Sequence, residues 1–331
     1  MDTEAAGRSA ASFIERGDPS YMEQTKSRAI ASKRRMSARE RHNTVAGYLF
    51  LVPFLIGLFV FTIYPFVYSL YLSFTEYSIV TPPKWIGLDN FVKMFTADDK
   101  FWISFVVTIK FALVQVPLKL IFSLLVAVLL SAKTKLTNTY RAAFYIPSLL
   151  GGSVAVAITW VQIWRSDGVV NKLLSSVGLP TNNWLKDPKT ALYVLVLLGV
   201  WQFGSQMLIF LAGIKDVPQS LHEAAIVDGA GPVKRFFKVT LPMLTPCIFF
   251  NLINGIIGSM QAFGSAFLVT QGGPMNSTLY YALYQYNQAF SYLHMGYASA
   301  MAWFLMIVIV LMTALVFRSS AGWVYYQDDR A

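Results

Sequence analysis

Residues 223–242 read EAAIVDGAGPVKRFFKVTLP, and this polar stretch lies between two long apolar runs of the chain. Glu223 stands at its beginning, basic residues follow in its second half, and Pro242 stands where the next apolar run begins. Gly229 permits a left-handed backbone and Pro232 cannot continue a helical hydrogen-bond ladder, so both interrupt a helix that starts upstream. The stretch therefore predicts a short helix, a turn and a second short helix, lying in the plane of a membrane and pointing out of it.

The first of these short helices is expected to begin after Ser220. Glu223 and Asp228 then lie in its first half, where negative charge is favourable to the helix dipole. Its apolar stripe consists of Leu221, Ala224, Ala225 and Val227. A partner in the aqueous phase that binds this helix is one interpretation. The alternative is a connecting loop whose amphipathic helix rests on lipid.

The composition of the whole chain indicates a polytopic membrane protein. Of its 331 residues, 55% are hydrophobic and 13% are charged, whereas soluble proteins have about 25% charged residues. A helix needs ~20 apolar residues to cross the hydrocarbon core of a bilayer. The segments that qualify are 46–72, 102–131, 142–164, 191–213, 243–268 and 297–318. We therefore predict an all-α bundle of six transmembrane helices.

Lysine and arginine are unevenly divided between the stretches that join these segments. If the N-terminus is cytoplasmic, 18 of these residues fall on cytoplasmic stretches and 7 on the opposite ones. The cytoplasmic stretches would be 1–45, 132–141, 214–242 and 318–331. Because cytoplasmic loops are enriched in Lys and Arg, we expect both termini in the cytoplasm. The predicted organisation is a basic tail at 1–45, a six-span domain at 46–318 and a C-terminal tail at 319–331.

The basic tail is better explained as a cytoplasmic anchor before the first span than as a nucleic-acid-binding segment, so no nucleic-acid partner is expected. It lacks the apolar core of a cleaved secretory signal. The single cysteine, Cys247, excludes a disulfide framework within the chain.

Motifs for chemistry are missing from the sequence. It has no G-x-x-x-x-G-K-[ST] phosphate loop, no Cys/His pair with metal-ligand spacing, and its histidines are isolated from one another. We therefore predict no catalytic residue, no metal site and no cofactor bound by this chain. If the chain moves a solute uphill, the energy must enter from a partner.

The polar stretch resembles the EAA loop of permease subunits of ATP-binding-cassette (ABC) importers. The pattern of that family is EAA, three residues, G, nine residues, then I-x-LP. This chain has EAA at 223–225, Gly229 and VTLP at 239–242, with every spacing kept and Val in place of Ile. The resemblance implies a type I importer permease, whose EAA helix docks into a cleft of a cytoplasmic ATPase subunit. The implied ATPase-coupling residues are Glu223, Ala224, Ala225, Asp228, Gly229 and Gly231.

The same resemblance implies the partners of the chain and its location. Two ATPase subunits bind ATP and magnesium, a second permease subunit is a different chain, and an extracytoplasmic solute-binding protein delivers the solute. The assembly lies among the lipids of the bacterial cytoplasmic membrane.

Other segments look like the carbohydrate-uptake branch of these permeases, of the maltose and glycerol-phosphate type. They are WIGLDNF at 85–91, YRAAFYIP at 140–147, NWLKDP at 183–188, QGGP at 271–274 and MGYASAM at 295–301. Within this branch the chain resembles the first permease subunit of bacterial alginate-oligosaccharide importers. The resemblance implies import of a carbohydrate, with an oligosaccharide, including an acidic one such as alginate, as the candidate solute. The alternatives are a permease for another solute such as glycerol phosphate, and an autonomous secondary transporter, for which spans two to six lack mid-membrane acids.

Polar side chains within the fourth and fifth spans are the candidates for contact with the solute. In the fifth span Asn251, Asn254, Gly258, Gln261 and Ser265 recur at helical spacing and are expected on one face. By resemblance, the sugar-contacting turn falls on Gly258, Ser259, Gln261 and Ala262. The fourth span offers Trp201, Gln202, Ser205 and Gln206. The alternative for each cluster is helix–helix packing through small and amide side chains.

Lys119 lies within the second apolar run. A cation near the middle of a membrane helix costs roughly 2.5–3.5 kcal/mol on insertion scales. Two hypotheses remain open: Lys119 forms an ion pair inside the bundle, or it offsets the charge of an acidic sugar.

Overall fold

The computed structural model describes residues 38–132 and 137–325. Most of the predicted basic tail and the last residues of the C-terminal tail lie outside this part of the chain. The chain divides into two units, Met1–Val67 and Tyr68–Ala331, and each is described by itself.

The described part of the first unit is helical. It consists of α3 (Ala38–Leu58), a π-helical turn η1 (Phe59–Ile63) and the start of α4 (Tyr64–Ser73). Pro53 lies inside α3 without ending it, whereas Pro65 is the second residue of α4, just after the π-helical turn. Large apolar side chains of this unit are exposed, with Phe50 at 85% and Phe61 at 81%. Such a surface suits lipid or a neighbouring protein.

Three stretches of helix are long and apolar enough to cross a membrane without a break: Tyr48–Ser73, α6 (Asp99–Ser131) and α17 (Met295–Ser320). Three further crossings are bent pairs of helices. α7 (Thr137–Leu150) meets α8 (Val154–Trp164) and α9 (Val169–Ser176) at 97°, and α10 (Ala191–Trp201) meets α11 (Gly204–Asp216) at 46°. α13 (Pro232–Arg235), η2 (Phe236–Thr240) and α14 (Leu241–Met243) meet α15 (Thr245–Met260) at 63°. The described residues thus hold up to six spans, as predicted.

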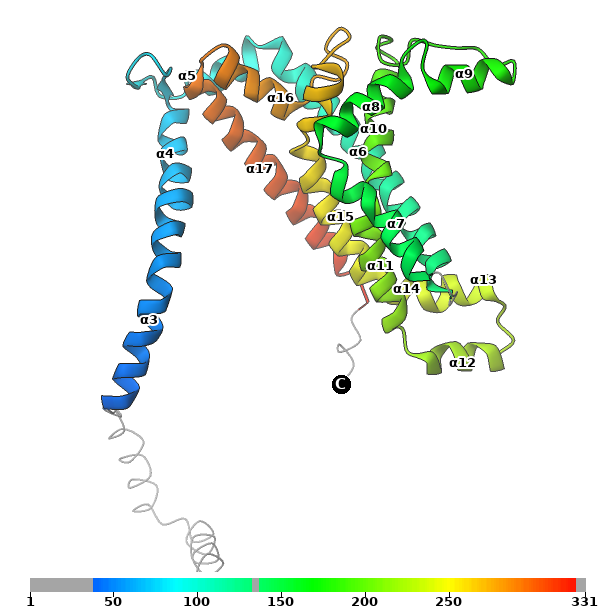
Figure 1. The fold of residues 1–331 in the computed structure, drawn as a ribbon. Coiled ribbons are helices and arrows are strands. Elements are labelled where there is room, and N and C mark those ends of the chain that lie inside the picture. Colours follow the sequence, from blue (N-terminus) through cyan, green and yellow to red (C-terminus); the bar gives the residue numbers. More distant parts are fainter. Residues whose placement is uncertain (1–37, 133–136, 326–331) are drawn as a thin grey trace, which may run out of the picture. The chain divides into compact units, whose positions relative to one another are not determined.

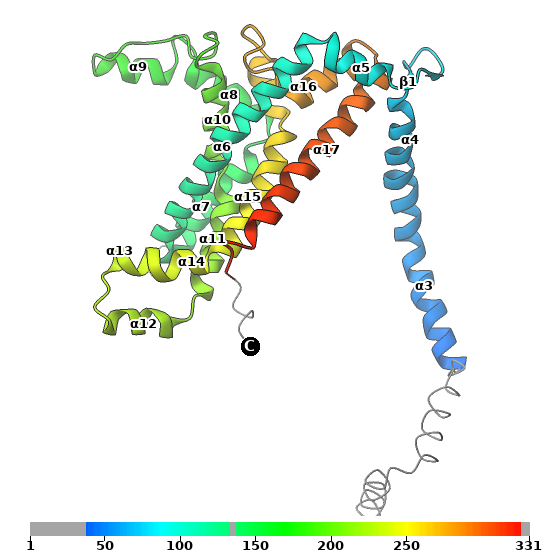
Figure 2. The same ribbon diagram turned by 180° about the vertical axis from the view of Figure 1, so that it is seen from behind.

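α6 lies at the centre of the second unit, where it packs against α10, α11 and α15. Asp98 caps its start by accepting a hydrogen bond from the backbone N–H of Phe101 (3.1 Å). Figures 1 and 2 show α12 (Gln219–Val227) and α13 at one end of this bundle, with α5 (Asp89–Thr96), α9 and α16 (Tyr281–Tyr286) at the other. We name them the α12 end and the α16 end.

The sequence did not predict the breaks inside the third and fourth spans. The two breaks contact each other. Gly151 and Gly152 end α7, and the hydroxyl of Ser153 caps α8 by accepting from Val156 N (3.3 Å). A Cβ atom on Gly151 would lie 2.1 Å from the Gln202 side chain. Gln202 stands at the end of α10 and donates its amide N–H to the Gly151 carbonyl (3.3 Å). The hydropathy of a span is averaged over about 20 residues, so a break of two or three residues does not change it. The breaks depend instead on a contact between segments that are distant in the sequence.

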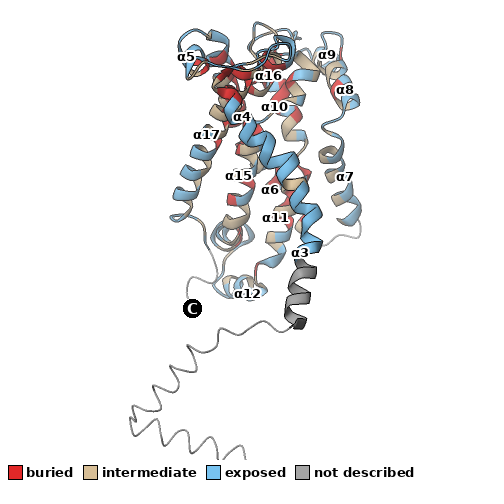
Figure 3. Cartoon of the chain, turned by 90° about the vertical axis from the view of Figure 1, so that its left-hand side faces the viewer, coloured by how far each residue is buried: buried red, intermediate tan, exposed pale blue. Residues whose placement is uncertain are grey.

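The α16 end holds the larger part of the buried core (Figure 3). Its remaining elements are β1 (Thr75–Glu76), β2 (Lys84–Trp85), η3 (Ala266–Thr270) and η4 (Asn287–Ser291). β1 and β2 pair antiparallel, with Thr75 opposite Trp85. Fully buried side chains of this end include Met94, Phe101, Tyr280, Tyr281 and Met301. Aromatic side chains pack edge to face here, as between Phe101 and Tyr281.

A carboxylate ties the elements of the α16 end together. Asp98 accepts hydrogen bonds from the hydroxyls of Tyr284 (2.7 Å) and Tyr297 (2.6 Å). The Tyr284 hydroxyl accepts in turn from the Gln288 amide (2.6 Å), whose oxygen lies 3.0 Å from Nδ1 of His294. α6, α16, η4 and α17 are therefore joined through one chain of polar side chains.

Two of the quoted sequence segments meet at β1. The Asn90 amide, in WIGLDNF, donates to the carbonyls of Ser73 and Thr75, both at 2.9 Å. Gly296, in MGYASAM, lies so close to Thr75 that a Cβ atom would stand 2.0 Å from its carbonyl oxygen. These segments therefore have a structural role in closing the α16 end.

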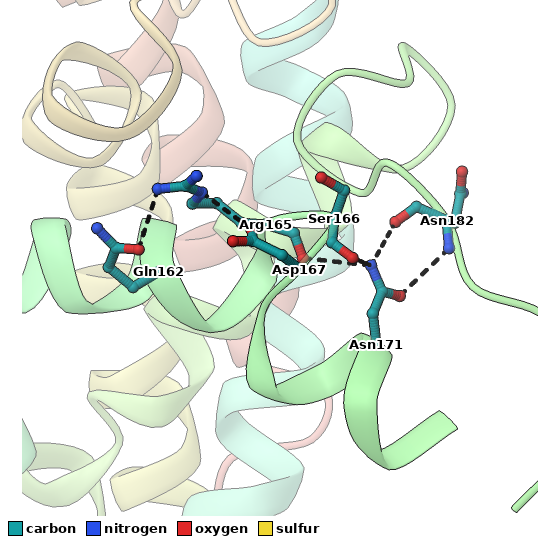
Figure 4. Close-up of polar contacts among 6 residues, drawn as sticks. All are labelled: Gln162, Arg165, Ser166, Asp167, Asn171 and Asn182. Atoms are coloured by element: carbon teal, nitrogen blue, oxygen red, sulfur yellow. Dashed lines mark hydrogen bonds and ion pairs between the residues drawn. The ribbon is translucent and has the colours of Figure 1, made fainter. Parts of the chain in front are cut away.

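The stretch between α8 and α10 is organised around Asn171 (Figure 4). This buried side chain donates to the carbonyls of Arg165, Ser166 and Asn182, at 3.2, 3.1 and 2.8 Å. Its oxygen accepts from Asn182 N (3.2 Å) and from the indole N–H of Trp184 (2.8 Å). Asn171 thus makes five hydrogen bonds to backbone and side-chain groups of a stretch that has no strand or long helix.

Candidate functional site

The stretch 219–240 forms a helix, a turn and a second helical segment at the α12 end, as predicted. α12 ends in a Schellman motif at Gly229. Ala230 N donates to Ala225 O and Gly229 N donates to Ile226 O, both at 2.9 Å. Gly229 has φ +72°, in the left-handed region that L-residues avoid. This position needs glycine, and the helix is nine residues long because of it.

The predicted placement of the acidic residues on α12 was wrong. The helix begins at Gln219 rather than after Ser220, because Pro218 supplies the extended residue before it. Glu223 therefore lies at its centre, and Asp228 caps its C-terminus, where negative charge is unfavourable to the dipole. A carboxylate oxygen of Glu223 accepts a hydrogen bond from the Gln219 amide one turn earlier (2.8 Å).

Apolar side chains of the α12 end are exposed. Val227 is 88% exposed and Val233 on α13 is 70% exposed, with Ile226 and Leu221 partly exposed beside them. Glu223, Ala224, Asp228, Gly229 and Gly231 are exposed as well, and Ala225 is half-buried. Gly231 differs from Gly229 because its φ of −67° suits any residue and a Cβ atom there meets open space.

A cavity of about 440 Å³ lies inside the helix bundle, and we name it the central cavity. Its wall comes from α6, the α7–α8 break, α10, α11, α15 and the segment that follows α15. The polar side chains in the wall are Gln115, Lys119, Ser153, Gln202, Ser205, Gln206, Asn254, Ser259 and Ser265. Both helix breaks contribute to it, through Gly151, Gly152 and Gln202. Amides, hydroxyls and apolar surface around such a volume suit a small polar solute.

Hydrogen bonds between distant helices fix this wall. The Ser259 hydroxyl on α15 donates to Oε1 of Gln115 on α6 (2.6 Å). A Cβ atom on Gly199 would lie 2.3 Å from Nε2 of Gln115, so Gly199 lets the amide sit against α10. About two turns further along α6, the Ser123 hydroxyl donates to the Lys119 carbonyl and lies 3.4 Å from Oε1 of Gln206. The wall is therefore preorganised by side chains from α6, α11 and α15.

The structure places most, not all, of the predicted pathway residues at this cavity. Those that line it are Lys119, Gln202, Ser205, Gln206, Asn254, Gly258, Ser259, Ala262 and Ser265. Asn251 is buried between helices, with its amide 3.5 Å from the Gln206 carbonyl. α15 ends at Met260, so Gln261 lies beyond the helix and does not share its face. Trp201 lies against Trp160 instead, with 6.0 Å between the ring centroids.

Gln115 is the cavity residue that sequence reasoning missed. It stands four residues before Lys119, so both lie on one face of α6. A glutamine and a lysine at this spacing within an apolar run were the available signal. The glycines of the α7–α8 break carry no such signal, because their role depends on the approach of Gln202.

Lys119 is half-buried in the wall of the central cavity. No Asp or Glu lines this cavity. Within residues 68–132 and 137–325, the ion pair lies elsewhere, between Arg165 and Asp167 (3.1 Å). The described residues also contain no group of His, Cys, Asp and Glu that could hold a metal ion. The hypothesis of an ion pair inside this chain therefore gains no support from the described residues.

Comparison with known proteins adds independent information. Residues 55–330 match the family described as binding-protein-dependent transport system inner membrane component. The probable ABC transporter permease protein YesP of Bacillus subtilis (strain 168) is 51% identical over 303 residues, which is 91% of this chain and 97% of YesP. The lactose transport system permease protein LacF of Rhizobium radiobacter is 32% identical over 292 residues, 86% of this chain and 97% of LacF.

A solved structure has the same fold. It is a bacterial ABC transporter involved in the import of the acidic polysaccharide alginate. One of its chains superposes with a TM-score of 0.74 at 21% identity, covering 86% of this chain and 97% of that one. The six predicted spans, the EAA spacing in an exposed loop and these similarities agree. This chain belongs to the family of inner-membrane permease components of binding-protein-dependent ABC transport systems.

Proposed function

We propose that this chain forms one of the two membrane-spanning halves of an ABC importer for a carbohydrate, most simply an oligosaccharide. The observation that carries the proposal is α12, a helix with the EAA spacing whose apolar side chains are exposed at the end of the bundle. An exposed apolar helix in a chain without a nucleotide-binding motif needs a partner that supplies both a covering surface and energy. Two ATPase subunits that bind ATP and magnesium provide both.

The orientation follows from the distribution of Lys and Arg along the chain. We place the α12 end, with both chain termini, in the cytoplasm, because the Lys and Arg residues concentrate on the stretches that share its side. The α16 end then faces outward and receives the solute-binding protein. Its short elements are closed by internal hydrogen bonds around Asp98, Asn90 and Asn171. Such a preorganised surface suits docking with little rearrangement.

The central cavity is the proposed place of the solute. Sugars offer hydroxyl groups and apolar faces, and the wall offers Gln202, Gln206 and Asn254 beside Phe111 and Phe263. Helix breaks beside a binding site are common in transporters, since freed backbone groups there contact the solute or the cavity. A second permease subunit, a different chain, would complete the pathway and cover the exposed helices of the first unit.

The proposal is tested with the complete transporter in proteoliposomes, assayed for ATP-dependent uptake and for solute-stimulated ATPase activity. Glu223→Ala should reduce both by at least about tenfold if Glu223 contacts an ATPase subunit. Gln219→Ala is the matched control, because it removes the hydrogen-bond partner of Glu223 within α12 and leaves the carboxylate in place. Normal uptake and full ATPase stimulation in Glu223→Ala would contradict coupling through α12.

A further inference from the structure

The charge in the wall of the central cavity is entirely positive. Lys119 contributes it, and no Asp or Glu lines this space. The amide oxygen of Gln115, one turn before Lys119 on α6, already accepts a hydrogen bond from the Ser259 hydroxyl. Among residues 68–132 and 137–325, no side chain forms an ion pair with the Lys119 ammonium. The cation is therefore held at the cavity without a counter-charge from this part of the chain.

Lys110 lies on the same helix and provides a comparison for Lys119. It precedes Lys119 by nine residues, which places it about half a turn away around the helix axis. Lys110 is exposed and does not line the cavity, whereas Lys119 is half-buried and does. An ionisable side chain inside a membrane bundle is costly and usually serves a substrate or ion pathway. Lys119 occupies the position of such a residue.

A second cavity, of about 570 Å³, is lined by residues around the α8–α9 connection, the loop before α10 and the segment 269–274. Leu268 lines the central cavity, and Val269 lines the second one. The basic side chains in its wall are Arg165 and Lys186, and no carboxylate lines it. Asp167 neutralises Arg165 (Figure 4), so Lys186 remains as the uncompensated charge. The wall of each cavity thus contains a lysine and no carboxylate.

Aromatic rings line both cavities. Trp164 lines the second cavity, and Phe111 and Phe263 line the central cavity. Apolar aromatic faces pack against the C–H faces of sugar rings, whereas lysine ammonium groups pair with anions. The two features together describe a solute that is both a sugar and an anion.

We propose that the imported carbohydrate carries an anionic substituent, a carboxylate or a sulfonate, and that Lys119 is the specificity-determining residue that binds it in the central cavity. This inference rests on the proposed function. The Lys119 ammonium is the ion partner of the substituent, while Gln202, Gln206 and Asn254 contact hydroxyl groups. An acidic residue of the second permease subunit would be the other way to satisfy Lys119.

The test compares matched sugars in the complete transporter. The first pair is a uronate trisaccharide and the same trisaccharide with its carboxylates reduced to alcohols, and the second is a sulfonated glycoside and its hydroxyl counterpart. Lys119→Gln should lower kcat/KM for the anionic member by at least about tenfold and change the neutral member less than about twofold. Lys119→Arg should keep most of the anionic uptake. The pair that shows the loss identifies the carboxylate or the sulfonate.

Lys110→Gln is the control, since it removes a lysine of the same helix that does not line the cavity. Equilibrium dialysis measures how tightly labelled sugar binds to the transporter without the solute-binding protein. The selectivity of that protein then does not contribute to the result. An equal loss of anionic and neutral uptake in Lys119→Gln overturns the inference and indicates an ion pair with the second permease subunit. Unchanged uptake of both members overturns it as well.

The two proposals fail in different ways. If the wild-type transporter imports only the neutral sugars with ATP, the anionic inference falls and the carbohydrate importer stands. If it imports none of the sugars in an ATP-dependent manner, the proposed function falls and the inference falls with it.

Discussion

The α16 end and the α12 end of the second unit differ in how far their side chains are buried (Figure 3). At the α16 end, Tyr281 is fully buried and the hydroxyls of Tyr284 and Tyr297 donate to Asp98. At the α12 end, Val227 and Val233 are largely exposed. The chain therefore completes the first end by itself and leaves the second to be completed by a partner. Substitutions at the α16 end should cost folding stability, and substitutions at the α12 end should cost coupling to ATP hydrolysis.

The largest loss of stability is expected from Asp98→Ala. This change removes the acceptor of two tyrosine hydroxyls and of the Phe101 backbone N–H. An unsatisfied buried donor costs about 1–3 kcal/mol, so we expect a total loss of about 3 kcal/mol or more. Thermal unfolding of the purified protein in detergent measures it. Tyr284→Phe, which removes one of the donors and leaves Asp98 in place, should cost about 1 kcal/mol. Equal unfolding temperatures for Asp98→Ala and wild type would show that Asp98 does not stabilise the α16 end.

A smaller loss is expected from Asn171→Ala, about 2 kcal/mol, because one side chain then leaves several groups of the α8–α10 stretch unsatisfied. Hydrogen exchange of residues 165–184 should rise before the rest of the unit is affected. Asn182→Ala serves as the control, because the backbone N–H and carbonyl of residue 182 that bond to Asn171 remain in that variant. If exchange rises equally in both variants, the loop does not depend on Asn171.

Alanine substitutions at two glycines of the α12 end should separate an effect on folding stability from an effect on coupling to ATP hydrolysis. Gly229→Ala forces a left-handed alanine and should cost about 1–2 kcal/mol, confined to the end of α12. We expect little change in the unfolding temperature and a clear loss of solute-stimulated ATPase activity. Gly231→Ala, two residues later, has an ordinary φ and open space around the added Cβ atom, and should retain activity. Identical activities of the two variants would show that the end of α12 does not affect coupling.

The smallest effect is expected from alkaline pH. Burial first, and then its hydrogen bond to the Asp98 carboxylate, raise the pKa of Tyr284 above its ordinary value. Because the folded-state pKa is the higher one, its stabilising contribution is fully present below about pH 10, the ordinary tyrosine pKa. It is lost as the pH rises above that value. Unfolding temperatures between pH 8 and 11 should therefore fall only at the alkaline end, with a shallower decline in Tyr284→Phe. The same decline in both proteins would assign the effect to other groups.

Local patterns in the sequence predicted much of the molecule. The six apolar runs predicted the spans, and the spacing of EAA, Gly229 and VTLP predicted the short helix and its end. These features depend on hydropathy and turn chemistry within a few residues, which act before any distant contact forms. The position of Asp228 was wrong because the left-handed Gly229 ends the helix directly after it, which places this acid at the C-terminus of α12.

The central cavity could be predicted only in part. Polar residues inside apolar runs identified Lys119, Gln202, Asn254 and Ser259 as candidates, and the structure brings them together. Periodicity on one helix could not separate Asn254, which lines the cavity, from Asn251, which packs against Gln206. Nor could it find the end of α15 before Gln261, because a span of uniform hydropathy gives no local sign of that break.

The sequence by itself determined that this chain crosses the membrane, where its polar loop lies and that a short helix there ends at the glycines of that loop, since those features depend on neighbouring residues. The tertiary structure alone decided that Gln115 meets Ser259 across 144 positions of the chain, that Gly151 makes room for Gln202, and that Lys119 lines a cavity without a carboxylate. Such contacts join segments whose separation along the chain carries no information about their distance in space. They form only when α6, α10 and α15 pack, and that packing creates the space in which a solute is expected to bind.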